Sequence, residues 1–317
     1  MHTTNPIILL SVILALSLPA SKAQTQLCSV PGDADLPACV EKLRSSGGGV
    51  VEITAEVQLT EALNLDNLSN VDFVGTQDAP VVISGGVRIP LSPCSNFQDL
   101  LCGDLSSIKG LARHLYFDGV RHSRPKASAN IVALFTAEST TVSTSSYTID
   151  TKELDSRLVK TVALWSENVE MVYTGQGSPW SESRCAVSSV DATESTLTVN
   201  MKTPCFDTLQ NKPCGQSTST PVIIENTGLA DLLSSDDENS FWVDAKNSRV
   251  YVKTSTSQSS FAVIPDLETL VSGSNVRSIT FKNLSFEHAT YNQATAPAGF
   301  IEQQSGALVY EPVTNSR

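Results

Sequence analysis

The sequence predicts a mainly β fold built from short strands, and three observations predict it. Four apolar runs of three or four residues follow one another between Gly47 and Gly86, rich in β-branched and aromatic residues. Asn, Asp, Ser, Gly and Pro fill most of the gaps, as is typical of turns between strands. The runs recur about every ten residues without intervening helices, which is compatible with a sandwich, a barrel or a parallel β-helix. We expect strands at 50–53, 63–65, 71–74 and 81–83.

A short helix before these strands favours the parallel β-helix among the three folds. In the segment 36–44, the apolar residues Leu36, Val40 and Leu43 share one helical face. Asp35 is a suitable N-cap, and three consecutive glycines soon after the segment would end the helix. The end of a β-helix exposes its core, and an amphipathic helix can cover that end. We therefore expect a helix that caps the first coil.

The chain begins with an apolar run at 7–18 that is too short to span a bilayer comfortably. Ser21, Lys22 and Ala23 then form the small-x-small pattern of a signal-peptidase site, although no Lys or Arg precedes the run. We expect cleavage after Ala23 and a secreted, extracellular protein with no membrane anchor after cleavage. An uncleaved membrane anchor is the alternative interpretation.

The charge balance of the chain is acidic, with 33 Asp and Glu against 21 Lys and Arg and a net charge of −12. Nucleic acids and anionic membrane surfaces attract basic proteins, so the balance argues against both as partners. It is compatible with a neutral glycan, and it also keeps a secreted protein soluble. We expect a monomer that needs no cofactor.

Seven cysteines follow the predicted signal peptide. In a secreted protein they predict disulfides rather than metal ligands, because no histidine stands among them at metal-site spacing. We expect no metal site and three bonded pairs: Cys28 with Cys39, Cys94 with Cys102, and Cys185 with Cys205. A bond between Cys205 and Cys214 is an alternative, and one thiol is left over in either arrangement.

Two N-glycosylation sequons begin at Asn67 and Asn283. We expect glycosylation at both positions, with higher occupancy at Asn67. Each asparagine also has a structural interpretation, because asparagine tolerates the left-handed backbone of tight corners.

Longer, hairpin-like strands replace the short runs between 88 and 265. We expect a strand and turn at 111–119, a strand pair at 162–173, a short helix near 227–233 and a hairpin at 241–252. The short strands resume at 276–290, where the apolar alternation slips by one residue at Asn283, as a corner would require. We expect the chain to divide into a signal peptide (1–23), a cap helix with the first coil (24–87), a β-rich insertion (88–265) and a resumed coil (266–317).

Together these segments resemble the start of secreted right-handed parallel β-helix proteins of the pectin-lyase-like superfamily. The resemblance covers most of the mature chain, in the family's order, and is carried by the cap helix, VVISGG (81–86), ARHLYFDGVRHSRPKA (112–127), FWVDAKNSRVYVK (241–253) and FEHAT (286–290). It implies a carbohydrate-active, glycosidase-like protein that acts on an extracellular polysaccharide, with a polysaccharide lyase as the alternative enzyme class. Family members continue through many further coils, so we expect this chain to be truncated and inactive as it stands.

Two kinds of residue are candidates for the chemistry. Glycoside hydrolysis needs two carboxyl groups facing one sugar, and Glu287 is a weak candidate because alternation with Phe286 places it on an outer face. We expect His288 to point inward and pack. Arg121 and Arg124 are weak candidates for holding an acidic sugar. Each has a simpler interpretation, a solvated strand residue or a basic surface loop, and no catalytic pair is visible.

Two other functions remain open at this point. A non-catalytic protein that binds polysaccharide or coats a cell wall or surface would use the same fold without an acid pair. An interaction module centred on the insertion is the second. Two outward carboxylates on adjacent coils would favour the hydrolase, and an aromatic stripe without them would favour the binding protein.

Overall fold

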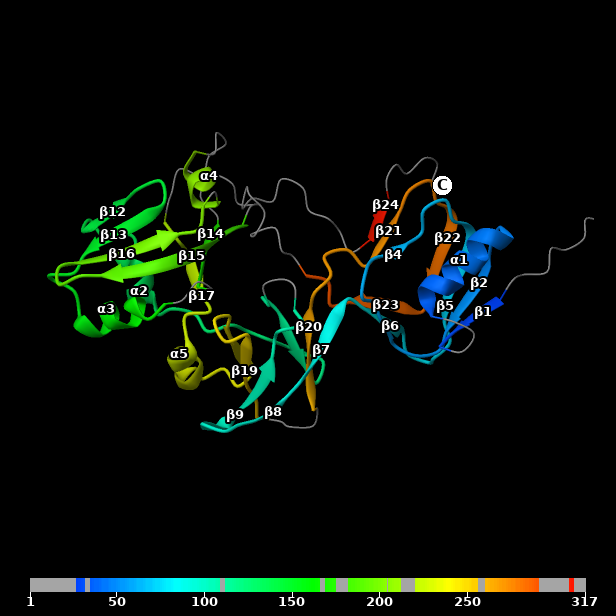
Figure 1. Cartoon of the computed structure of the whole chain (residues 1–317), viewed down its shortest axis with the longest axis horizontal. Coiled ribbons are helices and arrows are strands. Elements are labelled where there is room, and N and C mark those ends of the chain that lie inside the picture. The colour runs from blue at the N-terminus through cyan, green and yellow to red at the C-terminus, as the bar shows by residue number, and fades with distance from the viewer. Residues whose placement is uncertain are drawn as a thin grey trace, which may run out of the picture.

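The computed structural model describes the residue ranges 27–31, 35–108, 112–165, 169–174, 182–203, 205–211, 220–255, 260–290 and 308–310. This part of the chain is mainly β, with six sheets and five helices. Along the long axis of the molecule, three all-parallel sheets lie at one end, a six-stranded sheet at the other, and two smaller sheets between them (Figure 1). No helix among these residues is long and apolar enough to cross a membrane. The predicted signal peptide lies outside the described residues.

Three sheets contain only parallel strand pairs. Their strand orders are β1-β2-β5-β22, β23-β6-β3 and β24-β21-β4. Before the segment 88–265, which is called the insertion from here on, the strands are β1 (Leu27–Val30), β2 (Gly49–Ile53), β3 (Val57–Gln58), β4 (Leu63–Asn64), β5 (Ser69–Gly75) and β6 (Val81–Ser84). After it they are β21 (Val271–Gly273), β22 (Arg277–Lys282), β23 (Leu284–Glu287) and β24 (Leu308–Tyr310). All four strands predicted in this region are present, and the chain visits the three sheets in a fixed rotation.

Helix α1 (Leu36–Ser46) covers the parallel sheets at one side, in blue in Figure 1. The Asp35 side chain caps it by accepting a hydrogen bond from the Ala38 N–H at 2.9 Å. Gly47 ends it with a left-handed φ of 83°, a conformation that costs glycine little. The three predicted apolar residues are all buried, each contributing on the order of 2 kcal/mol. The capping helix predicted from the sequence is therefore present.

Asparagines in left-handed backbone turn the chain between the parallel sheets. Asn283, with φ 52°, separates β22 from β23, which accounts for the slip in apolar phase at that position. Successive strands also match side chain to side chain: Phe73 and Phe281 stack with ring centroids 5.1 Å apart. Lys282 pairs with Asp72 at 2.8 Å. The segments before and after the insertion thus form one stacked structure.

The chain between β6 and β21 forms antiparallel sheets. Their orders are β11-β10-β20-β7, β18-β19-β9-β8 and β12-β13-β16-β15-β14-β17. The first two contain β7 (Gly86–Pro90), β8 (Ser92–Cys94), β9 (Phe97–Asp104), β10 (Leu115–Phe117), β11 (Val120–His122), β18 (Ser240–Asp244), β19 (Arg249–Lys253) and β20 (Phe261–Pro265). The third contains β12 (Thr140–Val142), β13 (Ser146–Asp150), β14 (Glu170–Thr174), β15 (Glu182–Ala192), β16 (Thr196–Met201) and β17 (Ile223–Glu225). The helices are α2 (Ala129–Leu134), α3 (Ser156–Ala163), α4 (Cys205–Asn211) and α5 (Leu229–Ser234).

One element of the insertion differs from its prediction. The segment 162–173 was expected to be a pair of strands, but Val162 belongs to helix α3 and only β14 is a strand. The Asp155 side chain caps α3 by accepting from the Arg157 N–H at 2.8 Å, and Val162 is buried against the six-stranded sheet. Packing of this apolar face against the sheet, together with the polar cap, outweighs the strand propensity of the valines.

The described cysteines form three disulfides. The bonded pairs are Cys28–Cys39, Cys94–Cys102 and Cys185–Cys205, with Cα atoms 5.7, 5.2 and 5.6 Å apart. Cys214 lies outside the described residues. These bonds are compatible with an extracellular protein, because thiols in reducing compartments rarely form them.

Candidate functional site

Glu287 lies in a hollow of about 350 Å³ at the junction of the parallel sheets with the insertion. The hollow is lined by three carboxylate side chains, two aromatic rings, one arginine, one histidine and smaller residues: Glu56, Asp118, Glu287, Tyr116, Phe261, Arg88, His288, Val82, Gly119 and Val263. Glu56 precedes β3 and Glu287 ends β23, whereas Tyr116, Asp118 and Phe261 belong to the insertion. The site is therefore assembled from three segments that are distant in the sequence.

One hydrogen bond, from Ser285, orients Glu287 within this hollow. Its Oε1 accepts from the Ser285 hydroxyl at 2.8 Å, and Oε2 lies 4.0 Å from Nε2 of His288. The side chain is 43% exposed, so the carboxylate reaches solvent as the alternation predicts. Because this carboxylate is half-exposed and held by a neighbouring hydroxyl, it can contact a ligand from the position it already occupies.

His288 forms the wall beside Glu287. Its Nδ1 lies 2.9 Å from the hydroxyl of the buried Ser84, and its ring meets the Tyr116 ring edge-on at 4.7 Å. Burial lowers the pKa of His288, against the raising effect of Glu287 and Glu56. The expectation that His288 packs inward agrees with these contacts. A neutral imidazole at pH 7 leaves the carboxylates and the Arg88 guanidinium as the charged groups of the hollow.

The other two carboxylates differ in their surroundings. Glu56 forms an ion pair with Arg88 at 2.8 Å, and Arg88 also lies over the Phe261 ring with 4.8 Å between its guanidinium carbon and the centroid. Asp118 sits at a left-handed position, φ 50°, in the exposed turn between β10 and β11. The three carboxylates can accept hydrogen bonds from sugar hydroxyls, and an exposed aromatic face can stack on a sugar ring.

Arg121 and Arg124 line a second hollow, of about 200 Å³, between β11, β15 and β17. The two residues differ sharply. Arg121 is exposed, and its Nη2 lies 2.7 Å from Nδ1 of His114. The Arg124 side chain is only 3% exposed, and its Nη2 pairs with Glu170 at 2.7 Å and with Glu225 at 2.6 Å. Arg124, expected to hold a substrate, thus has its guanidinium engaged inside the protein.

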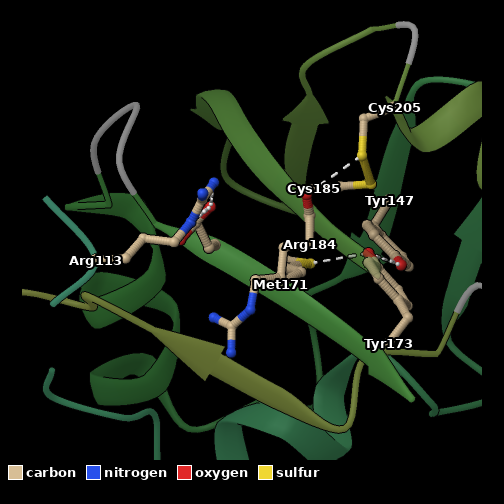
Figure 2. Close-up of a disulfide and its surroundings, with 8 residues drawn as sticks. Arg113, Tyr147, Met171, Tyr173, Arg184, Cys185 and Cys205 are labelled. Carbon is tan, nitrogen blue, oxygen red and sulfur yellow. Dashed lines mark hydrogen bonds and ion pairs between the residues drawn. A yellow bond between two sulfur atoms is a disulfide. The ribbon is translucent and has the colours of Figure 1, made fainter. Parts of the chain in front are cut away.

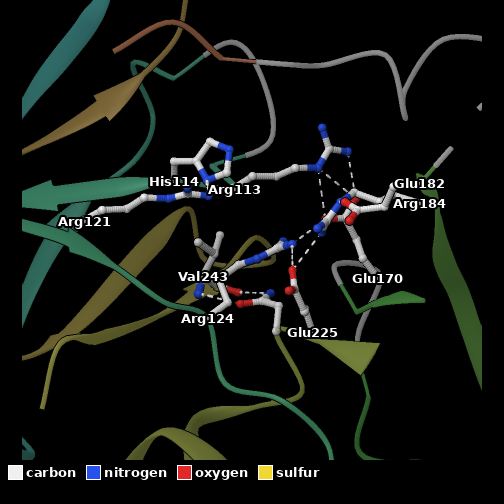
Figure 3. A network of polar contacts seen from close by, with 10 residues as sticks. Arg113, His114, Arg121, Arg124, Glu170, Glu182, Arg184, Glu225 and Val243 are labelled. Atoms are coloured by element: carbon white, nitrogen blue, oxygen red, sulfur yellow. Dashed lines mark hydrogen bonds and ion pairs between the residues drawn. The ribbon is translucent and has the colours of Figure 1, made fainter. Parts of the chain in front are cut away.

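The network around Arg124 joins three arginines to three carboxylates, as Figure 3 shows. Glu170 also accepts from Nε and Nη2 of Arg113, at 3.0 and 2.7 Å. Glu225 also accepts from Arg184 at 2.8 Å, and Arg184 in turn bonds Glu182 at 2.7 Å. The network crosses from the segment before β10 to the six-stranded sheet and connects two sheets of the insertion.

Glu170 is the most deeply buried member of this network. Burial opposes its ionisation, but the charges of Arg124 and Arg113 prevail and lower its pKa to about 2. Burial likewise opposes ionisation of Glu225, and Arg124 and Arg184 prevail there too and lower its pKa. Both carboxylates are therefore ionised at neutral pH. Such pairs need every partner, since an uncompensated buried charge is strongly destabilising.

The Cys185–Cys205 disulfide fixes the strand that presents Arg184. Figure 2 shows Cys185 on β15, directly after Arg184, bonded to Cys205 at the start of α4. Beneath it the hydroxyls of Tyr147 and Tyr173 lie 2.8 Å apart, and both side chains are buried. Burial raises the pKa of Tyr147 and that of Tyr173 well above the ordinary value, so both phenols stay neutral. The disulfide and the buried tyrosine pair thus hold in place the strand that carries Arg184.

Sequence reasoning missed most of the residues around these hollows. Asp118 and Tyr116 stand in a segment where the sequence predicts only a strand and a turn, and Glu56 stands in a gap between apolar runs. The signal for Glu170 is its place in a strand, Glu170–Thr174, where Val172 on the same face is buried. A charged residue on a buried face requires a partner, but the sequence does not name it.

Comparison with known proteins gives one structural likeness. No protein-family model matches the chain, and no characterised protein matches its sequence significantly. A solved structure named as a glycoside hydrolase superposes with a TM-score of 0.63 and 16% sequence identity, over 84% of this chain and 51% of that one. The chain therefore spans about half the length of that protein. At this identity the likeness concerns the fold.

Proposed function

We propose that this protein is a secreted, carbohydrate-active member of the right-handed parallel β-helix proteins, with a saccharide bound in the hollow of Glu287. The observation that carries the proposal is the lining of that hollow, where three carboxylates meet the aromatic rings of Tyr116 and Phe261. The likeness to a glycoside hydrolase supports a fold in keeping with this role. The three disulfides support secretion.

The parallel sheets support the β-helix fold that we propose. Strands from the first coil and the resumed coil pair in register, β5 with β22 and β6 with β23, across the whole insertion. A chain that returns to the same three sheets in rotation winds as a helix of strands. We also propose that the segment 88–265 is a separate inserted domain, because it has its own cores of buried residues.

A glycosidase-like reaction would assign two of the carboxylates to proton transfer and to stabilisation of the positive charge that develops on the sugar ring. Glu287 is the residue we assign to contact the reacting sugar, because its carboxylate is oriented by Ser285 and open to solvent. Asp118 is the partner free to approach the opposite side of a ligand, since Glu56 is paired with Arg88.

The test is binding and turnover of neutral oligosaccharides from plant and algal walls, measured with wild type and the Glu287→Gln variant. Calorimetry reports binding, and chromatography of the products reports turnover. Glu182→Gln, on the exposed side of the insertion, is the matched control. Turnover abolished by Glu287→Gln but not by Glu182→Gln supports the glycosidase.

Binding without turnover supports the second candidate, a non-catalytic polysaccharide-binding protein. It is favoured specifically by the pairing of Glu56 with Arg88, which leaves fewer carboxylates available for acid–base work. A protein that neither binds nor cleaves any oligosaccharide, with Tyr116→Ala and Glu287→Gln behaving as wild type, would contradict both candidates.

A further inference from the structure

The second hollow carries more positive charge than its carboxylates can neutralise. Its lining includes four arginines and one lysine in a protein whose net charge is −12. Three of the arginines are matched by the carboxylates of Glu170, Glu182 and Glu225. Arg121 and Lys126, both exposed, pair with no carboxylate among the described residues. Two cations therefore remain for an outside partner.

The lowered pKa of His114 reflects the same excess of positive charge. Burial, together with the charges of Arg121, Arg124, Arg184 and Arg113, lowers the pKa of His114 to about 4. Because arginine has no acceptor, Nδ1 of the neutral ring accepts the bond from Arg121 at 2.7 Å. Figure 3 shows the His114 ring beside the Arg121 guanidinium, which is thereby positioned without losing its charge.

A histidine in the same lining offers an unused hydrogen-bond acceptor. His122 is 3% exposed, and its Nδ1 donates to the Val120 carbonyl at 3.1 Å. Burial lowers the pKa of His122, so at neutral pH its Nε2 is an acceptor, and no described residue donates to it. A buried acceptor without a donor is costly, and a ligand hydroxyl would satisfy it.

We propose that this hollow binds an anionic saccharide, with Arg121 and Lys126 holding the oxyanion of a sulfate ester or uronate and His122 accepting from a neighbouring hydroxyl. The guanidinium fork matches sulfate and carboxylate oxygens, and the lysine adds a point charge. The volume of about 200 Å³ suits one charged residue of a chain rather than a whole oligosaccharide. The saccharide rests on the proposed function, whereas the oxyanion site does not.

The test compares four probes on the oxidised full chain: a neutral oligosaccharide, its sulfated counterpart of the same backbone, an oligouronate of the same length, and inorganic sulfate. The variant is Arg121→Gln with Lys126→Gln. The control is Lys152→Gln with Lys160→Gln, which removes the same charge from exposed positions in and beside α3. We expect the charged saccharides to bind wild type more weakly as salt is added. The first variant should weaken that binding at least about tenfold, and the control should leave it unchanged.

A second readout concerns His122. Its imidazole ¹⁵N signals should move when the charged saccharide binds, and should not move with inorganic sulfate, which has no carbon-borne hydroxyl to donate at neutral pH. Equal affinity of the Arg121/Lys126 variant and wild type for the charged saccharides overturns the proposal. Binding of inorganic sulfate as tight as that of the sulfated saccharide overturns the assignment to a saccharide.

The two proposals fail separately. Binding of the neutral oligosaccharide that depends on Glu287 but gains nothing from sulfate or carboxylate would uphold the proposed function and contradict this inference. The opposite result is binding of charged saccharides that depends on Arg121 and Lys126, with no effect of Glu287→Gln and no binding of the neutral oligosaccharide. It would uphold this inference and contradict the proposed function.

Discussion

Asn275 donates its side-chain amide to the side-chain oxygen of Asn67 at 2.9 Å, and both residues hold left-handed backbone, with φ values of 53° and 58°. They are 208 positions apart and occupy the same corner in successive layers of the parallel sheets. The contact uses the oxygen of Asn67, whereas its side-chain nitrogen has no partner among the described residues. That nitrogen is the atom to which an N-linked glycan is attached.

The two sequons should therefore differ in occupancy. Asn67 is exposed with its nitrogen open, while the Asn283 nitrogen donates to the carbonyls of Gly75 and Gln77 at 3.2 and 2.6 Å. We expect glycan at Asn67 and none at Asn283 after expression in a eukaryotic secretory pathway. Intact mass should show loss of the glycan in Ser69→Ala, and in Ser285→Ala only the change expected from the substitution itself. Loss of glycan mass in Ser285→Ala would contradict the prediction.

Replacing Glu170 should destabilise the insertion strongly. Glu170→Gln removes the carboxylate that receives both Arg113 and Arg124, leaving buried guanidinium charge without its partner. We expect a loss of about 3–5 kcal/mol in the free energy of unfolding, measured by chemical denaturation. Glu182→Gln, whose side chain is 48% exposed, should cost less than about 1 kcal/mol. Equal losses in the two variants would show that the buried network is not what holds these sheets.

The same carboxylate predicts how stability depends on pH. The folded pKa of Glu170 is about 2, below its ordinary value of 4.5, so the folded state holds the proton less tightly than the unfolded state. Its stabilising contribution is complete above pH 4.5 and is lost as the pH falls toward 2, in total on the order of 3 kcal/mol. The stability difference between wild type and Glu170→Gln should shrink across that window. A difference that stays constant from pH 5 to pH 2.5 would refute this assignment.

Gly75 should not tolerate a side chain. A Cβ at this position would collide with the carbonyl oxygen of Asn283, a backbone atom of the next layer. We expect Gly75→Ala to lower the free energy of unfolding by about 2 kcal/mol or more, because the corner cannot move without breaking the β5–β22 pairing. Asp78→Ala, in the exposed turn that follows, should stay within about 0.5 kcal/mol of wild type.

The strands of the parallel sheets and the helix beside them could be predicted because the sequence signals for them are local. Short apolar runs, turn residues and a capped helix each depend on neighbours within a few positions, as Asp35 and Ala38 show. The prediction failed at α3, where Val162 and its neighbours favour strand by propensity but pack as a helix against a sheet formed elsewhere in the chain. Tertiary packing outweighed propensity at that position.

The candidate sites were harder to predict because they depend on register between distant segments. Glu56, Asp118 and Glu287 line one hollow only because β7 and β10 both pair with β20, beside the end of β23. Arg121 and Arg124 look alike in the sequence, yet one is exposed and the other is paired to two carboxylates, both more than 40 positions away. Their difference follows from packing of the six-stranded sheet, and no local pattern encodes it.

The pairing of β5 with β22 also has a consequence for synthesis. Val71 lies opposite Ile279, so the partner of β5 leaves the ribosome 208 residues later, 279 minus 71. At about 5–20 residues per second, that interval is roughly 10–40 s. Throughout it, the nascent first layer presents an unpaired strand edge and the apolar ring of Phe73 to its surroundings. Translation speed through the intervening segment, and the holding of this edge by a chaperone, would then set the yield of folded protein.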